Sequence, residues 1–264
     1  MKRFLLLVSF CCIAASAAQA AVQGKEVSYQ ANGTTLKGYL AYDDAIKGKR
    51  PAVLVVHEWW GHNAYARKRA DMLAALGYTA LAVDMYGDGK QANHPDEAGK
   101  FAAEVSRNMP LAKVRFEAGL QLLRGQKTVD AKQVAAIGYC FGGGVVLNMA
   151  RIGEDLKGVA SFHGSLDTDI LAQPGKIKAR IVSFTGEDDV MITAGKVSAF
   201  KQEMENARAS FRVVTYPGVK HSFTNPDADA LGKKFGLPLA YNAAADKDSW
   251  QQATVFLREI FGER

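Results

Sequence analysis

The chain has 264 residues, of which 48% are hydrophobic and 23% are charged, a composition that excludes a disordered or fibrous protein. The formal net charge of +6 comes from scattered Lys and Arg residues, and near the C-terminus Lys233 and Lys234 form only an isolated pair. We therefore interpret the basic balance as a solvated surface and expect no nucleic-acid partner.

The first twenty residues have the pattern of a secretory signal. Lys2 and Arg3 form a positive segment, residues 4–15 are apolar, and Ala18-Gln19-Ala20 is a small-x-small cleavage site. The apolar run is shorter than the ~20 residues that span a bilayer, so we expect cleavage rather than an uncleaved anchor. The prediction is a signal peptide over 1–20 and one domain over 21–264, which is periplasmic or secreted and makes no stable membrane insertion after cleavage.

Strand and helix patterns alternate along the rest of the chain. Residues 27–42 predict a hairpin that turns at Asn32-Gly33. Further strands are predicted at 52–56, 79–83, 134–138, 158–162, 180–185 and 211–216, and helices at 64–76, 96–105, 111–123, 143–151, 193–207 and 246–261. Short apolar strands between helices predict an α/β fold with a mostly parallel central sheet and helices on both faces. Ligands of such sheets bind at the carboxyl ends of the strands.

The segment Gly138-Tyr139-Cys140-Phe141-Gly142-Gly143 carries the strongest functional signal. It follows the apolar run 134–137 and matches the G-x-nucleophile-x-G elbow of the α/β-hydrolase fold, with Cys in place of the usual Ser. The amides at the start of the following helix favour a thiolate. Because Cys11 and Cys12 lie in the predicted signal peptide, Cys140 is the one thiol expected in the mature protein. A buried, inert Cys that packs as a small hydrophobe is the alternative.

A cysteine nucleophile needs a histidine base, and in this fold the chain order is nucleophile, acid, histidine. Of the five histidines, only His163 and His221 follow Cys140. His221 comes after the last predicted strand and is the predicted base. His163 ends an earlier strand and is predicted to be a hydrogen-bonded wall of the pocket.

The acid that orients the base is expected after the strand 180–185, in Gly186-Glu187-Asp188-Asp189-Val190-Met191-Ile192. The spacing from the glycine, with apolar Ile192 three residues further on, favours Asp189. Asp188 is the alternative, since a shift of one residue exchanges the two side chains.

The segment His57-Glu58-Trp59-Trp60-Gly61-His62 follows the strand 52–56. Its two histidines are five apart, whereas the zinc motif H-E-x-x-H places them four apart on a helix, so we expect no metal. In α/β-hydrolases a backbone N–H after this strand contributes to the oxyanion hole. We therefore predict an oxyanion hole made by the N–H groups of Trp59 and Phe141, each worth about 3 kcal/mol.

Together these motifs resemble the dienelactone hydrolase family (carboxymethylenebutenolidases). The resemblance is carried by H-E-W-W-G, G-Y-C-F-G-G, G-E-D-D-V and K-H-S-F, and it extends from about Val27 to Phe261. It implies catalytic roles for Cys140, Asp189 and His221. It also implies that Glu58 gates the thiol, because the family's glutamate pairs with the resting thiol and swings away when substrate binds.

Two positions depart from the family members that cleave dienelactone, which hold the substrate carboxylate with arginines. After Asp84-Met85-Tyr86 the chain continues as Gly87-Asp88-Gly89-Lys90, and Asn225 stands four residues after His221. We therefore expect dienelactone itself to be a poor substrate.

The sequence thus predicts a Cys-His-Asp hydrolase that cleaves small esters or lactones through an acyl-enzyme, with no cofactor. The predicted pocket residues are Trp60, Tyr86, His163 and Phe223, and the predicted state is a monomer. The alternative function is a non-catalytic exported protein that binds a ligand or senses thiols on a hydrolase fold.

Overall fold

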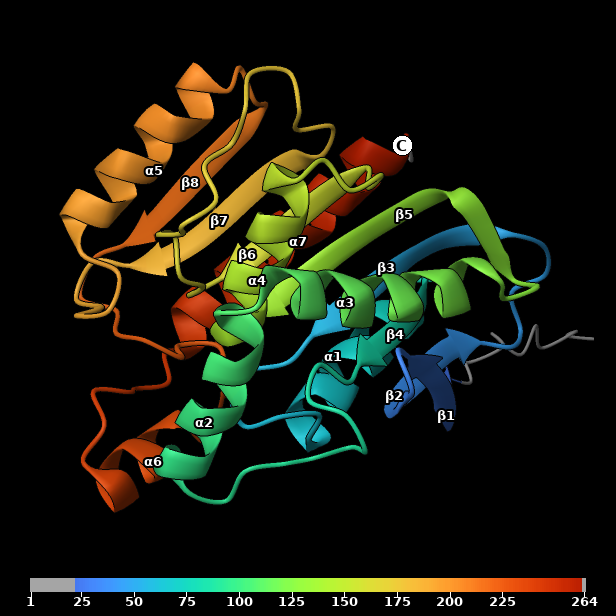
Figure 1. Cartoon of the computed structure of the whole chain (residues 1–264), viewed down its shortest axis with the longest axis horizontal. Coiled ribbons are helices and arrows are strands. Elements are labelled where there is room, and N and C mark those ends of the chain that lie inside the picture. Colours follow the sequence, from blue (N-terminus) through green and yellow to red (C-terminus); the bar gives the residue numbers. More distant parts are fainter. Residues whose placement is uncertain (1–21, 263–264) are drawn as a thin grey trace, which may run out of the picture.

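The computed structural model describes residues 22–262, so the predicted signal peptide lies outside the described residues. The strands are β1 (Val22–Ala31), β2 (Thr34–Asp43), β3 (Arg50–Val56), β4 (Thr79–Val83), β5 (Val129–Tyr139), β6 (Gly158–Phe162), β7 (Arg180–Gly186) and β8 (Phe211–Tyr216). They form an eight-stranded sheet in the order β1-β2-β4-β3-β5-β6-β7-β8 (Figure 1). The β1–β2 and β2–β4 pairs are antiparallel and all other neighbours are parallel. The predicted mostly parallel sheet is confirmed.

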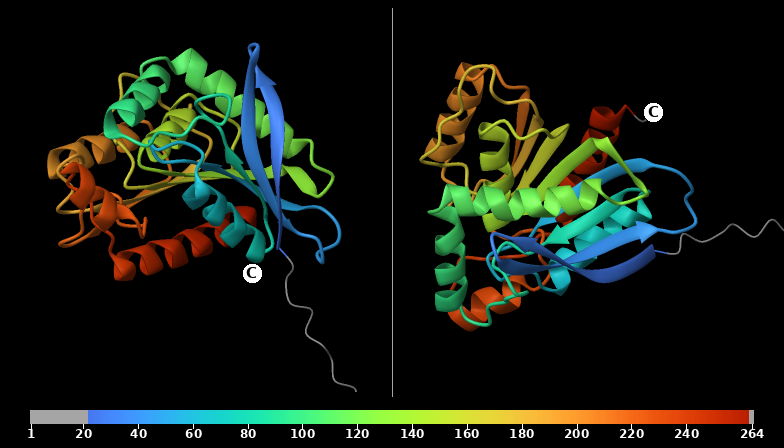
Figure 2. Two further views of the ribbon diagram at one scale, coloured as in Figure 1. Left: turned by 90° about the horizontal axis from the view of Figure 1, so that it is seen from below. Right: turned by 45° about the vertical axis from the view of Figure 1, so that its right-hand side comes forward.

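Helices cover both faces of this sheet. They are α1 (Ala64–Ala75), α2 (Pro95–Ser106), α3 (Met109–Arg124), α4 (Phe141–Arg151), α5 (Ala194–Asn206), α6 (Ala228–Phe235) and α7 (Ala243–Phe261). α1 and α7 pack on one face, and α3, α4 and α5 on the other. Figure 2 shows α1 and α7 on the opposite side of the sheet from α3. None of the helices within residues 22–262 combines the length and the apolar character needed to cross a bilayer.

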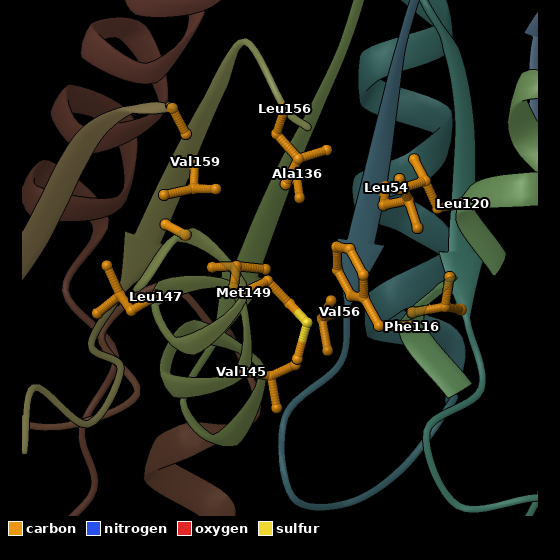
Figure 3. Close-up of a cluster of buried hydrophobic side chains, with 14 of the residues drawn as sticks. Leu54, Val56, Phe116, Leu120, Ala136, Val145, Leu147, Met149, Leu156 and Val159 are labelled. Carbon is orange, nitrogen blue, oxygen red and sulfur yellow. The ribbon is translucent and has the colours of Figure 1, made fainter. Parts of the chain in front are cut away.

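The two-residue period of a strand explains how one segment serves both faces. In β3, Leu54 and Val56 point to the core beneath α3 and α4, whereas Val53 and Val55 point to α1 and α7. Figure 3 shows Leu54 and Val56 among side chains of α3 and α4. A strand buried on both faces therefore reads as a continuous apolar run, and each fully buried side chain contributes about 1.5–3 kcal/mol.

Some predicted boundaries are corrected by the structure. The hairpin begins at Val22 instead of 27, and β5 begins at Val129 instead of 134. The first residues of both strands are largely exposed and polar, so they lack the apolar pattern from which a strand is predicted. The turn at Asn32-Gly33 is as predicted, with φ of 46° and 80°. The helix after the elbow begins two residues earlier than predicted, at Phe141.

Helix α6 was not predicted at all. It is eight residues long and includes a glycine, so its local pattern is weak. It is held instead by tertiary contacts, in which Leu231 and Phe235 pack against a small apolar cluster around Trp60.

Candidate active site

Cys140 lies at the carboxyl edge of the sheet, between the end of β5 and the start of α4. Its φ is 51° and its ψ is −116°, a strained backbone conformation that costs a non-glycine residue about 1–3 kcal/mol. A side chain on Gly138 would overlap the backbone of Gly142, and one on Gly142 would overlap the carbonyl oxygen of Val56. The two glycines are therefore required for the turn that exposes the sulfur.

His221 and Asp189 approach Cys140 from the loops after β8 and β7. The Nε2 atom of His221 lies 3.2 Å from Cys140 Sγ, and its Nδ1 lies 2.7 Å from Asp189 Oδ2. Because the carboxylate accepts, the Nδ1 of His221 carries a proton and Nε2 faces the sulfur. Burial alone would lower the pKa of His221, but the neighbouring Cys140 sulfur and Asp189 carboxylate outweigh it and raise the pKa to about 10. His221 Nε2 is thus placed to take the proton of Cys140.

The structure also separates the two aspartates. Asp189 is buried, and its second oxygen accepts hydrogen bonds from the backbone N–H groups of Met191, at 2.8 Å, and Ile192, at 3.3 Å. Asp188 is exposed. The carboxylate that reaches His221 is therefore that of Asp189, the residue favoured by the sequence spacing.

Glu58 is buried beside this group, but its partner is not the thiol. The side-chain amide of Asn225 donates to Glu58 Oε2 at 2.6 Å, and among the described residues Glu58 Oε1 has no hydrogen-bond partner. Burial raises the pKa of Glu58 above its usual value, and the hydrogen bond from Asn225 offsets only part of this rise. The predicted pairing of Glu58 with the resting thiol is thus not the arrangement seen here. The carboxylate is bonded to Asn225, and the thiol faces His221.

The segment that carries Trp59 is fixed by hydrogen bonds on both sides. His57 donates from Nδ1 to the carbonyl of Glu58 at 2.6 Å and accepts the Met85 N–H at its Nε2 at 3.2 Å. The Tyr86 hydroxyl donates to the carbonyl of Trp59 at 3.0 Å. Both His57 nitrogens are therefore occupied by backbone groups.

The two predicted oxyanion-hole residues both border the site. Trp59 and Phe141 line the cavity that contains Cys140. Phe141 is the first residue of α4, where a helix leaves its N–H groups without intrahelical partners. The Phe141 N–H is therefore free of an intrahelical partner at the edge of the cavity.

A cavity of about 830 Å3 opens over Cys140 and His221, a volume within the usual range of small-molecule sites. Its wall comes from the α2–α3 junction, from α4, from the loop after β6 and from the residues after Asp189. Residues that the sequence reasoning missed include Arg107, Met109, Asp167, Asp169, Ile170, Met191 and Leu239. Most of them lie in connections, where neither periodicity nor a motif marks them.

Four predicted pocket residues do not line this cavity and are corrected here: Trp60, Tyr86, His163 and Phe223. All four are nearly or fully buried beside it. Trp60 packs against Phe235 and Tyr86 packs beneath Phe141, while the rings of His163 and Phe223 pack against each other. An aromatic residue next to such a motif can pack in the core below the site or line its wall, and the sequence does not distinguish the two.

A mostly parallel sheet, a cysteine at a strained strand-to-helix turn, and a histidine and a carboxylate from later loops are the features of an α/β-hydrolase. The sequence profile of the dienelactone hydrolase family matches residues 36–261. The chain belongs to the dienelactone hydrolase family and is an ester or lactone hydrolase of that family, as the resemblance of its motifs predicted.

Individual relatives agree with this assignment. Protein usf of Aquifex pyrophilus is 27% identical over 240 residues, covering 89% of this chain and 98% of the relative. A protein of Aquifex aeolicus (strain VF5), provisionally named carboxymethylenebutenolidase, is 27% identical over 241 residues, covering 89% and 98%. The crystal structure of a dienelactone hydrolase-like promiscuous phosphotriesterase from metagenomic libraries superposes with a TM-score of 0.83 at 31% identity, covering 91% of this chain and 99% of the other.

Proposed function

We propose that this protein is a periplasmic or secreted thiol hydrolase that cleaves small esters or lactones through a covalent acyl-enzyme. The observation that carries the proposal is the contact of Cys140 Sγ with His221 Nε2, whose other nitrogen bonds to buried Asp189. Nucleophile, base and orienting acid stand in the order and geometry that acyl transfer needs. The protein acts as a monomer and uses no cofactor in this proposal.

The first half of the reaction forms the acyl-enzyme. The thiol proton passes to His221 Nε2, and the sulfur attacks the carbonyl carbon to form a C–S bond. The carbonyl oxygen takes the negative charge, which the N–H groups of Trp59 and Phe141 stabilise. The C–O bond to the leaving group then breaks, and His221 returns its proton to the departing alkoxide.

The second half releases the acid. His221 takes a proton from water, and the hydroxide attacks the acyl carbon. The C–S bond breaks, His221 returns its proton to the Cys140 sulfur, and the carboxylic acid departs. Asp189 keeps the His221 ring in the required tautomer through both halves.

A panel of esters and lactones, tested with the purified protein, examines this proposal directly. Steady turnover that is lost after alkylation of Cys140 is expected. A phosphotriester belongs in the panel, since a relative with 31% identity is described as a phosphotriesterase. A single burst without further turnover would support the alternative, a ligand-binding or thiol-sensing protein.

Neutral substrates are expected to have a higher kcat/KM than carboxylate-bearing ones. Asn225 is turned toward Glu58, and the cavity wall offers one exposed cation, Arg107, against two carboxylates, Asp167 and Asp169. Among the described residues of the wall, Arg107 is thus a single guanidinium beside two carboxylates, which oppose the binding of a substrate carboxylate. The absence of one charge-assisted contact corresponds to about 1.5–3 kcal/mol, or roughly 10- to 150-fold. Kinetics on a dienelactone and its methyl ester measure this difference, and a clear preference for the free acid would point to Arg107 as its ligand.

Glu58→Gln is expected to leave the alkylation rate of Cys140 within about twofold of wild type. The carboxyl group is already bonded to Asn225 while the sulfur faces His221, so its charge does not restrain the thiol. Iodoacetamide kinetics without substrate measure this rate. An increase of tenfold or more would restore the gating role that the family resemblance implies.

A further inference from the structure

A second histidine lies directly beneath the proposed catalytic group. His163 follows β6, is fully buried, and has a φ of 40°, an uncommon conformation for a residue other than glycine. Its ring centroid lies 5.2 Å from that of His221 in an edge-to-face contact and 5.2 Å from that of Phe223. The proposed reaction does not use it.

The hydrogen bonds of His163 fix its protonation state. The backbone N–H of Cys140 donates to His163 Nδ1 at 3.2 Å, as well as to the carbonyl of Phe162 at 3.0 Å. Since an N–H can only donate, Nδ1 carries a lone pair, and the ring proton sits on Nε2. Nε2 lies 2.7 Å from the hydroxyl oxygen of Thr224 and donates to it. Burial, and then the nearby His221, lower the pKa of His163 well below its usual value, in agreement with a neutral ring.

Thr224 is itself anchored to α1. Its hydroxyl lies 2.6 Å from that of Tyr65, which accepts a hydrogen bond from Arg69 Nε at 3.2 Å. Arg69 also donates to the Thr224 carbonyl at 2.7 Å and to Asp246 in α7 at 2.6 Å. A buried chain of hydrogen bonds thus leads from two helices on one face of the sheet to the backbone of the nucleophile.

We propose that His163 is a positioning residue of this hydrolase: Thr224 holds it as the neutral Nε2–H tautomer, so that it fixes the Cys140 backbone and supports the His221 ring. This inference rests on the proposed function. If His163 were protonated, its Nδ1–H would face the Cys140 N–H, and two donors would meet. The ring would also carry a second positive charge next to the imidazolium of His221. Because the Thr224 hydroxyl accepts a hydrogen bond from the Nε2–H of His163, the lone pair stays on Nδ1, where it accepts the Cys140 N–H.

Thr224→Val and Thr224→Ser form the matched test. Valine keeps the shape and removes the acceptor, whereas serine keeps the hydroxyl. We expect Thr224→Val to lower kcat about tenfold, because the Nε2–H of His163 is then a buried donor without a partner. KM should stay within about twofold of wild type, because the hydrogen-bond chain lies outside the cavity lining. Thr224→Ser should restore kcat to within about twofold of wild type. Wild-type kcat in Thr224→Val, with only a lower Tm, would show a structural role alone and overturn the proposal.

A second pair examines His163 itself and does not depend on Thr224. Asn keeps an acceptor near the Nδ1 position and tolerates positive φ, whereas Phe keeps the ring and lacks the acceptor. His163→Asn is expected to retain more kcat than His163→Phe. Equal losses, or a larger loss in His163→Asn, would contradict the acceptor role.

Alkylation separates the two proposals. The iodoacetamide rate at Cys140 is followed on its own peptide in the full chain of all four variants, without substrate. It is expected to fall in Thr224→Val and His163→Phe. If wild type cleaved no ester and this pattern still appeared, the proposed function would fail while the positioning role stood; unchanged rates in all variants would overturn the positioning role.

Discussion

Cys140→Ala is expected to lower kcat for ester hydrolysis by several orders of magnitude while the protein stays folded. In the proposed mechanism the substitution removes the thiol that forms the acyl bond, and the remaining groups supply little of the rate. Cys140→Ser should retain a small activity, since a Ser–His pair is also competent. Steady-state kinetics beside a thermal melt measure both effects, and undiminished hydrolysis by Cys140→Ala would falsify the nucleophile assignment.

Asp189→Asn is expected to lower kcat about 10⁴-fold with little change in KM. The Asn carbonyl can still accept the N–H groups of Met191 and Ile192, so the loop keeps its form. Its amide, however, presents a donor to His221 Nδ1 and favours the wrong imidazole tautomer.

Asp188→Asn is the matched control for this substitution. Asp188 is the adjacent residue and is exposed, so its loss should change kcat by less than about twofold. If the two variants exchanged phenotypes, the acid would be Asp188 and the contact seen with His221 would not be the functional one.

The elbow and the triad candidates could be predicted because local rules mark them. The glycines at 138 and 142 are dictated by backbone overlap within a few residues of Cys140. Chain order then left few choices for the base, and the spacing after a strand pointed to Asp189. Parallel strands place all these loop residues at one edge of the sheet, so the sequence order of strands also predicts where the site lies.

What surrounds the triad could not be predicted in the same way. Thr224 and Tyr65 are 159 residues apart, and no motif in either segment predicts their contact. The cavity wall comes from connections such as 106–109 and 165–170, whose positions follow from tertiary packing. For the same reason the sequence predicts that Trp60 and Phe223 line the pocket, although both lie in the core.

The role of Glu58 shows the limit of a motif. The segment H-E-W-W-G correctly places the carboxyl group near the site, but its partner depends on Asn225, 167 residues away. The side-chain amide of Asn225 donates to the Glu58 carboxylate, so the carboxylate has a partner other than the thiol. The motif therefore predicts where Glu58 lies and not what it holds.

The most direct test of the central claim is to trap the covalent intermediate. The protein is mixed with an activated ester, quenched in acid within milliseconds to seconds, and analysed by mass spectrometry of the intact chain and its peptides. We predict a mass increase equal to one acyl group, located on the peptide that contains Cys140, which decays at the rate of turnover. Turnover without an adduct on Cys140, or with the acyl group on another residue, would contradict the proposed mechanism.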